Sequence, residues 1–207
     1  MSHTYLTQLH LGLGSFHRAH QAVYMQALHD QGDKRWRIVG GNLRPDMLDT
    51  IAALQASQGS YTLETVNTAG ERQYQVINAI QDIISWDKDL TGLTQLAANP
   101  NTRIISFTVT EAGYYLDAHD QLDTSFADLR SDLAGTTRST IYGALTQLLT
   151  ARMQAQAGAI TLLNCDNLRS NGERFMGGLQ QFLQQSGHHE LLAWLASHAS
   201  APNSMVD

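Results

Sequence analysis

The segment Arg-Ile-Ile-Ser-Phe-Thr-Val-Thr at residues 103–110 restricts the possible folds of this chain more than any other. Nearly all of its side chains are apolar or β-branched, which favours a strand. A strand with one face in water would alternate polar with apolar residues, and this segment does not. Such a strand is typical of the middle of a parallel sheet, where helices cover both faces. We therefore expect an α/β fold built around residues 103–110.

Segments typical of strands and of helices alternate along the rest of the chain. Short apolar or β-rich runs predict further strands at residues 6–13, 36–41 and 159–164. Apolar side chains at helical spacing predict helices at residues 15–30, 47–54, 89–99, 140–156, 171–185 and 190–198. This alternation predicts a Rossmann-like, doubly wound and mostly parallel α/β sheet.

Two β-rich runs at residues 61–68 and 72–77 interrupt the alternation. Ala69, Gly70 and Glu71 lie between them, and the glycine suits a tight turn. We interpret the two runs as a β-hairpin inserted after the second strand. The chain contains no internal repeat or low-complexity linker, so residues 1–207 are expected to form one domain.

The sequence Gly12-Leu13-Gly14 lies between the first predicted strand and the first predicted helix. In a dinucleotide-binding fold the first glycine permits a tight turn, and the second lets the backbone approach a pyrophosphate. Unpaired N–H groups at the helix start then attract the phosphate charge. His17 stands where a third glycine is usual. For this motif alone, a simple strand-to-helix turn is the alternative interpretation.

The second predicted strand ends in a loop that bears on the choice of nucleotide. An acidic residue often binds the ribose hydroxyls there, but residues 40–46 are Gly-Gly-Asn-Leu-Arg-Pro-Asp. Asn42 or Asp46 could bind a ribose, whereas Arg44 could favour a 2'-phosphate. Asp46 could instead simply stabilise the start of the next helix. The preference for NAD or NADP stays open at this point.

Composition and charge argue against several classes of protein. The net charge of −6 provides no basic surface for nucleic acid. No apolar run approaches the roughly 20 residues of a membrane span. Residues 1–5 lack the pattern of a secretory signal. The single cysteine, Cys165, cannot form an internal disulfide, which is consistent with a cytoplasmic protein.

Other catalytic motifs are absent or incomplete. The chain has neither the GxxxxGK[ST] phosphate loop nor the GxSxG nucleophile elbow. His17 and His20 could share a metal ion on one helix, but no third ligand lies nearby, so we predict no metal site. Cys165 ends a buried strand and is interpreted as a small buried thiol.

Polar residues follow two of the predicted buried strands, at residues 108–114 and 164–167. Ligands of open α/β sheets bind at the carboxyl ends of the strands, where both segments should lie. The amide of Asn167 could donate to a developing oxyanion. The alternative is that Asp166 or Asn167 caps the helix predicted to begin near Asn171.

Taken together, these motifs resemble those of the polyol-specific long-chain dehydrogenases, the mannitol dehydrogenase family. Residues 12–21, Gly-Leu-Gly-Ser-Phe-His-Arg-Ala-His-Gln, resemble the family's opening fingerprint. Residues 108–114 and 164–172 are similar to its second and third motifs. Residues 202–207 resemble the start of a fourth, which normally continues with an arginine. The resemblance covers essentially the whole chain and implies a dinucleotide-binding domain.

The resemblance implies reversible hydride transfer between a secondary alcohol of a small polyol and a nicotinamide, without zinc. It implies NAD as cofactor, with NADP not excluded. Asn167 would help to hold and polarise the reacting oxygen. The residues expected to bind the cofactor are Gly12, Leu13, Gly14, Ser15, Phe16, Asn42, Arg44, Thr110, Glu111 and Gly113.

In the family, the general base is a lysine on a mostly helical second domain, which is expected beyond Asp207. Lys34 and Lys88 are the only lysines here, and neither lies in a predicted carboxyl-edge loop. We therefore expect this chain to bind NAD, to turn over poorly or not at all alone, and to expose an apolar face where the second domain docks.

The choice of branch within the family depends on two short stretches. Residues 42–44 and 110–115 favour a branch that converts D-arabinitol to D-xylulose. Branches acting on mannitol or fructuronate are alternatives, and so is a non-catalytic dinucleotide-binding module.

Overall fold

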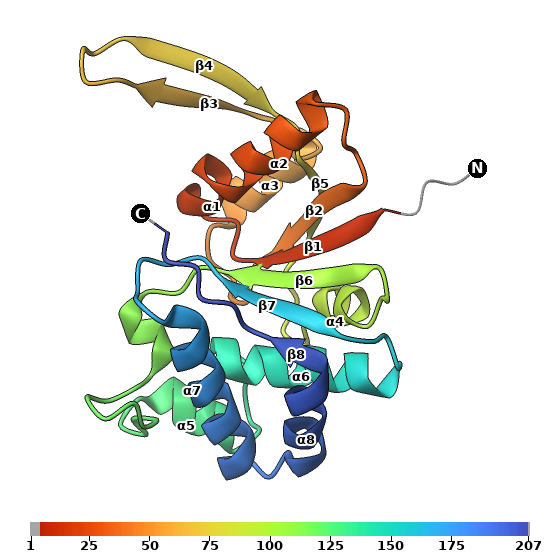
Figure 1. Ribbon diagram of the computed structural model, residues 1–207, viewed down its shortest axis with the longest axis vertical. Helices are drawn as coiled ribbons and strands as arrows, with labels where there is room; N and C mark the ends of the chain where they lie inside the picture. Colours follow the sequence, from red (N-terminus) through yellow and green to blue (C-terminus); the bar gives the residue numbers. More distant parts are fainter. Residues whose placement is uncertain (1–4, 207) are drawn as a thin grey trace.

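A single six-stranded sheet, in the order β5-β2-β1-β6-β7-β8, organises the computed structural model of the protein, which describes residues 5–206 (Figure 1). Residues 1–4 of the N-terminal segment discussed above, and Asp207 of the fourth motif, lie outside the described residues. All neighbouring strands are parallel. The strands are β1 (Leu6–Leu11), β2 (Trp36–Gly41), β5 (Ile80–Ile84), β6 (Thr102–Phe107), β7 (Ile160–Asn164) and β8 (Ala199–Ser200). The predicted doubly wound sheet is confirmed.

Helices cover both faces of this sheet (Figure 1). One face carries α1 (Ser15–Ala19), α2 (Gln21–Asp30) and α3 (Leu48–Ala56). The other carries α4 (Thr91–Ala97), α6 (Ile141–Gln154), α7 (Asn171–Gln185) and α8 (His189–His198). A short 3-10 helix, η1 (Glu111–Tyr114), and α5 (Ala127–Leu133) lie between β6 and α6. Within residues 5–206, no helix combines the length and the hydropathy that crossing a membrane requires.

The predicted hairpin is also confirmed. The strands β3 (Tyr61–Val66) and β4 (Arg72–Ile77) pair antiparallel and extend away from the rest of the protein (Figure 1). In the turn, the side-chain oxygen of Asn67 accepts the amide N–H groups of Ala69 and Glu71. The hairpin follows α3 and precedes β5, so it is an insertion in the crossover from β2 to β5.

The two faces of β1 meet different environments, because successive side chains of a strand point to opposite faces. Leu9 and Leu11 pack in the larger apolar cluster, with residues of α4, α6 and α7. Gln8 and His10 alternate with them and contact side chains of α1 and α2. The sheet therefore has a polar strip under the first helix, where an apolar face would be the usual arrangement.

Several elements differ from the sequence-based expectation. The strand predicted for residues 103–110 ends at Phe107, and the one predicted for residues 6–13 ends at Leu11. The helix predicted for residues 15–30 is divided at His20, whose N–H bonds the His17 carbonyl in the tighter i→i+3 manner. Neither β5, β8 nor α5 was predicted. β5 is an outer strand with exposed Gln81 and Asp82, which obscure its apolar pattern.

β2 packs closely against Leu13, which lies in the turn after β1. A Cβ at Gly40 would lie 2.7 Å from Cγ and 2.9 Å from Cδ1 of Leu13, whose side chain is fully buried and cannot withdraw. We expect Gly40→Ala to lower the free energy of unfolding by about 1–3 kcal/mol, measured by denaturant titration.

Gly177 in α7 is the matched control, because its Cβ would meet no atom within 4 Å. Gly177→Ala should leave stability unchanged or raise it by about 0.5–1 kcal/mol through helix propensity. Equal effects of the two substitutions would contradict the packing argument.

Candidate functional site

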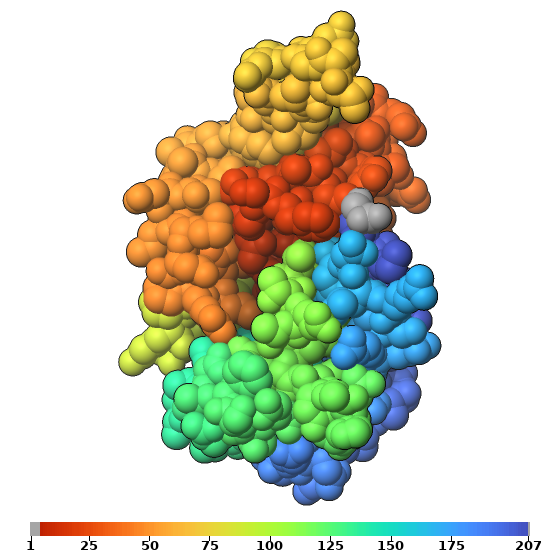
Figure 2. Space-filling model, turned by 90° about the vertical axis from the view of Figure 1, so that its left-hand side faces the viewer, coloured from red at the N-terminus to blue at the C-terminus, as the bar shows by residue number. Residues whose placement is uncertain are grey.

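A groove of about 440 Å³ opens at the carboxyl ends of β1, β2 and β6. Figure 2 looks onto this edge, where the hollow lies between the orange residues that follow β2 and the green residues that follow β6. The chain leaves β1 for one face of the sheet and leaves β6 for the other. Diverging loops of this kind form the crevice in which open α/β sheets bind their ligands.

The glycine turn forms one wall of the groove. Gly12 has a φ of +103°, a conformation that favours glycine, and its N–H donates to the Gly41 carbonyl at 2.8 Å. The N–H of Gly14 donates to the Gly12 carbonyl at 2.8 Å. A Cβ on either glycine would meet no protein atom within 4 Å. The missing side chains therefore leave open space that a ligand can fill.

The start of α1 adds hydrogen-bond donors to this wall. The N–H of Arg18 donates to the Gly14 carbonyl at 3.3 Å. Residues 15–17 precede it in the first helical turn, where N–H groups have no helical acceptor. Backbone donors in this position suit an anionic ligand.

Asn42 joins the glycine turn to the loop that follows β2. Its side-chain oxygen accepts the N–H of Leu13 at 3.0 Å, and its amide nitrogen donates to the Asp46 carbonyl and carboxylate at 3.2 and 3.3 Å. The residue lines the groove and is buried. Both ends of its amide are thus engaged within the protein.

Arg44 reaches from the same loop across the groove. Its guanidinium donates to the Ser139 carbonyl at 3.0 Å, to the Tyr115 hydroxyl at 3.3 Å and to the Asp128 carboxylate at 3.3 Å. The Tyr115 hydroxyl donates in turn to Asp128 at 2.6 Å. Burial, helped by this carboxylate, raises the pKa of Tyr115 to about 12. We call this set of four residues the Arg44 bridge.

The residues after β6 form the opposite wall. Thr110 and Gly113 line the groove, and the N–H of Gly113 donates to the Thr110 carbonyl at 2.8 Å. Glu111 is exposed beside them and Asn167 is exposed after β7, both outside the groove lining.

Asp166 connects the third motif with its surroundings. Its carboxylate accepts from the Tyr114 hydroxyl, from the Asn171 amide at 3.0 Å and from the Leu168 N–H at 3.2 Å. Ser170 occupies the N-cap of α7 without a side-chain cap bond. Asp166 therefore does not occupy the N-cap of α7, and its carboxylate instead links η1 to the loop after β7 and the start of α7.

The groove brings together six of the predicted site residues: Gly12, Gly14, Asn42, Arg44, Thr110 and Gly113. Leu13 is buried beneath the turn, while Ser15 and Phe16 are exposed at the start of α1. Sequence reasoning missed Tyr115, Asp128 and Ser139 of the Arg44 bridge. Nothing in residues 116–139 indicated that this segment folds back over the groove.

Lys88 follows β5 and therefore lies at the carboxyl end of that strand. The expectation that neither lysine lies in a carboxyl-edge loop is wrong for Lys88, because β5 was not predicted. Lys34 precedes β2 at the opposite edge. Neither lysine is among the residues that line the groove.

Cys165 and the histidines were weighed above as a nucleophile and as metal ligands. No cluster of three or more metal-ligating side chains occurs in the part of the chain that the structure describes. Cys165 is free and buried, as expected, and burial raises the pKa of its thiol to about 12. The thiol therefore stays protonated at neutral pH.

Two histidines are buried beneath the glycine turn. The rings of His10 and His17 stack with centroids 3.5 Å apart. Burial lowers the pKa of His17 to about 4, and burial together with the neighbouring His17 lowers the pKa of His10 well below its usual value. Both rings are therefore neutral at pH 7.

The chain is similar to known proteins over nearly its whole length. The family model of the mannitol dehydrogenase Rossmann domain matches residues 7–207. D-arabinitol 4-dehydrogenases of Klebsiella pneumoniae and Ralstonia nicotianae are 51% and 52% identical, covering 97% and 96% of this chain but 44% and 43% of those proteins. The ternary complex of Pseudomonas fluorescens mannitol 2-dehydrogenase with NAD and D-mannitol superposes with a TM-score of 0.89 at 32% identity, covering 98% of this chain and 42% of that one. The chain thus spans less than half the length of these relatives.

The buried His17 predicts a stability that depends on pH. In the unfolded chain, His17 takes up a proton near pH 6.5, whereas in the folded protein it stays neutral until about pH 4. Stability is therefore fully present above pH 6.5 and falls as the pH drops towards 4, by roughly 3 kcal/mol for this residue. Denaturant titrations between pH 7.5 and 4 on the protein and on His17→Gln measure the difference. Parallel pH profiles of the two proteins would contradict the assignment.

Proposed function

Because the chain belongs to the mannitol dehydrogenase family, where it matches the Rossmann domain, we propose that it is the nucleotide-binding part of an NAD-dependent polyol dehydrogenase. One observation of the structure supports this most strongly. Gly12 and Gly14 leave open space in a groove at the carboxyl ends of the central strands, where dinucleotides bind in this type of fold.

The groove residues fit the parts of a dinucleotide. The backbone at Gly12 and Gly14 accommodates the pyrophosphate, since no side chain blocks its approach. Asp46 lines the groove after β2, where an acidic residue binds ribose hydroxyls. The loop with Thr110 and Gly113 forms the side of the groove where the nicotinamide belongs. When bound, NAD supplies the hydride acceptor.

Arg44 supports NAD rather than NADP. An arginine after β2 can accommodate a 2'-phosphate, but here the guanidinium already bonds Asp128 and two further oxygen atoms. A 2'-phosphate would have to displace Asp128 or leave that carboxylate beside its own negative charge. The bridge thus disfavours NADP.

The substrate proposal rests on two relatives of high sequence identity. Two D-arabinitol 4-dehydrogenases are 51–52% identical to this chain over nearly all of it. We infer that the whole protein oxidises a secondary alcohol of D-arabinitol to the ketone, D-xylulose. The alcohol carbon gives a hydride to NAD, and the hydroxyl proton passes to a general base. Asn167, exposed after β7, would donate its amide to the reacting oxygen.

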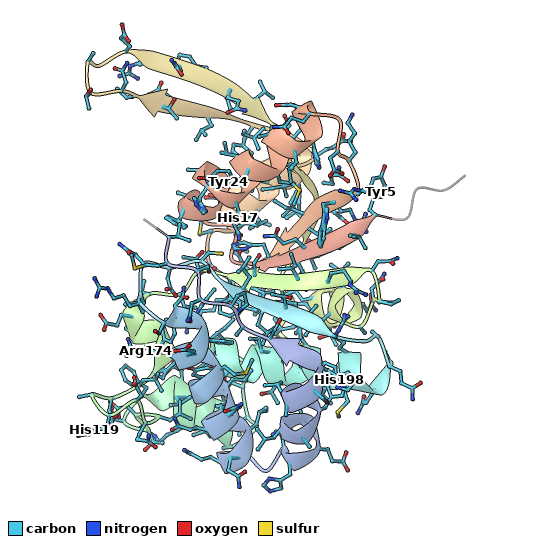
Figure 3. All side chains as sticks on the ribbon, in the orientation of Figure 1. Tyr5, His17, Tyr24, His119, Arg174 and His198 are labelled. Atoms are coloured by element: carbon cyan, nitrogen blue, oxygen red, sulfur yellow. The ribbon has the colours of Figure 1, made fainter. Side chains whose placement is uncertain are left out.

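The remaining part of the whole protein should supply the general base and dock on the first helices. No lysine lines the described groove. Phe16, Tyr24 and Leu28 are 43%, 64% and 41% exposed, although all three are large apolar side chains of the first two helices. Tyr24 and Leu28 share an apolar cavity of about 320 Å³ with Val206 (Tyr24 is labelled in Figure 3). An exposed apolar surface of this kind marks an interaction site.

The single cysteine also bears on the cellular compartment of the whole protein. Cys165 is the single cysteine of the chain and is free and buried. A chain with no disulfide is consistent with the reducing cytoplasm, where we place the whole protein.

Activity of the whole protein tests the substrate. We expect D-arabinitol with NAD to give the highest kcat/KM when it is compared with D-mannitol oxidation and D-fructuronate reduction. The 207-residue chain alone should bind NAD but give no measurable turnover. A higher kcat/KM for D-mannitol or D-fructuronate would move the protein to another branch of the family, and robust turnover by the chain alone would contradict the placement of the base.

The Arg44 bridge predicts which substitution changes the choice of nucleotide. Asp128→Asn removes the charge that competes with a 2'-phosphate for Arg44, so the affinity for NADP relative to NAD should rise about tenfold. Calorimetric titration of both nucleotides measures the ratio. Asp123→Asn is the control, because it removes the same charge from the same segment without contact to Arg44. An unchanged ratio in Asp128→Asn, or a shift shared by the control, would refute the role of the bridge.

A further inference from the structure

A row of buried polar side chains crosses the sheet beneath the glycine turn. Gln8 and His10 belong to β1 and Ser106 to the neighbouring β6, and none is more than 6% exposed. The Gln8 amide nitrogen lies 2.8 Å from the Ser106 hydroxyl, and this hydroxyl lies 2.9 Å from Nδ1 of His10. Nε2 of His10 lies 2.9 Å from the Gly12 carbonyl. Buried polar groups are costly unless each has a partner, and here each does.

The chemistry of the last acceptor determines the direction of every bond in this row. A carbonyl only accepts, so Nε2 of His10 carries the proton and donates to Gly12. The ring is neutral, and Nδ1 is therefore a bare acceptor for the Ser106 hydroxyl. The hydroxyl oxygen accepts in turn from the Gln8 amide. The row holds His10 in one tautomer.

Both polar atoms of the peptide that joins Gly12 to Leu13 are held by buried side chains. His10, from β1, holds the carbonyl oxygen, and Asn42, from the end of β2, holds the N–H at 3.0 Å. The same carbonyl also accepts the Gly14 N–H. The peptide plane is thus fixed from two strands, with its oxygen bonded to a fully buried ring.

This restraint matters for an anionic ligand. Glycine has two broad ranges of φ available, so an unrestrained peptide beside Gly12 could rotate easily. Rotation would turn a carbonyl oxygen, which carries partial negative charge, towards the phosphates. The restraint keeps that oxygen on the protein side of the turn.

We propose that His10 is a positioning residue for the pyrophosphate of a bound dinucleotide, acting through the Gly12 carbonyl that it holds in place. The proposal rests on the proposed nucleotide-binding function. His10 itself, being fully buried, would not touch the ligand.

The variant His10→Phe tests the proposal, since it keeps an aromatic ring against His17 and removes the donor to Gly12. We expect the dissociation constants of NAD and ADP to rise about tenfold, the effect of losing one well-placed hydrogen bond. Adenosine, which has no phosphate, should bind within about twofold of its original affinity. Calorimetry on the 207-residue chain measures all three ligands. Equal weakening of adenosine and ADP, or no weakening of either, overturns the proposal.

Thr102→Val is the matched control for loss of a buried hydrogen bond. Thr102 is fully buried in β6, and its hydroxyl donates to the Leu96 carbonyl at 2.7 Å, at the strand end opposite the groove. The control should lose stability without changing the ratio of ADP to adenosine affinity. A changed ratio in the control would show that the readout reflects general destabilisation, and would overturn the proposal.

A second measurement does not depend on the folding of His10→Phe. Nitrogen chemical shifts of His10 in the unaltered protein should show only the Nε2–H tautomer at neutral pH. Ser106→Ala should keep this tautomer, because the Gly12 carbonyl still accepts from Nε2, and should lose less ADP affinity than His10→Phe. An Nδ1–H tautomer in the unaltered protein overturns the proposal. Failure of the unaltered protein to bind either NAD or ADP would instead contradict the proposed function itself.

Discussion

The register of β1 between β2 and β6 determines where the site residues lie. Leu11, the last residue of β1, pairs with Gly41 on one side and with Phe107 on the other. Gly12, Asn42 and Thr108 therefore follow their strands side by side at one edge of the sheet. A shift of one residue would reverse the faces of Leu9 and His10 and move the buried polar row into the apolar core. The apolar packing of Leu9 and Leu11 thus holds the groove in place as well as the sheet.

Electrostatics in the groove depend mainly on the backbone. Arg44 is the one cation among the described residues that line it, and its charge is already paired with Asp128. His10 and His17 lie close by but are neutral. An anionic ligand would therefore meet peptide N–H groups rather than a free positive side chain. Such a site favours a pyrophosphate held by fixed dipoles over a more highly charged ligand.

The sequence was sufficient for the parts of the fold and site that depend on local pattern. The apolar and β-branched run at residues 103–110 predicted the central strand, although the strand ends at Phe107. The Gly12-Leu13-Gly14 turn lies in the groove at the carboxyl ends of the strands, the edge where the sequence predicted a ligand. The hydrogen bond between the Asn42 side chain and the Leu13 N–H could not be predicted from local pattern, because the two residues are 29 positions apart in the sequence. Asp128 likewise bonds Arg44 although the two are 84 positions apart in the sequence. Asp128 belongs to a segment of short elements whose apolar residues show little periodicity. Contacts of this kind exist only once the sheet has formed.

The most direct test of the account is the substitution Gly14→Val, because Gly14 has an ordinary φ of −71° and open space around its missing side chain. A valine there should leave the fold and its thermal midpoint unchanged while filling the space assigned to the pyrophosphate. Calorimetric titration with NAD should then show affinity lower by at least about tenfold, since a ligand group and a side chain cannot share one volume. Undiminished NAD binding by a correctly folded Gly14→Val protein would contradict the assignment of this groove as the dinucleotide site.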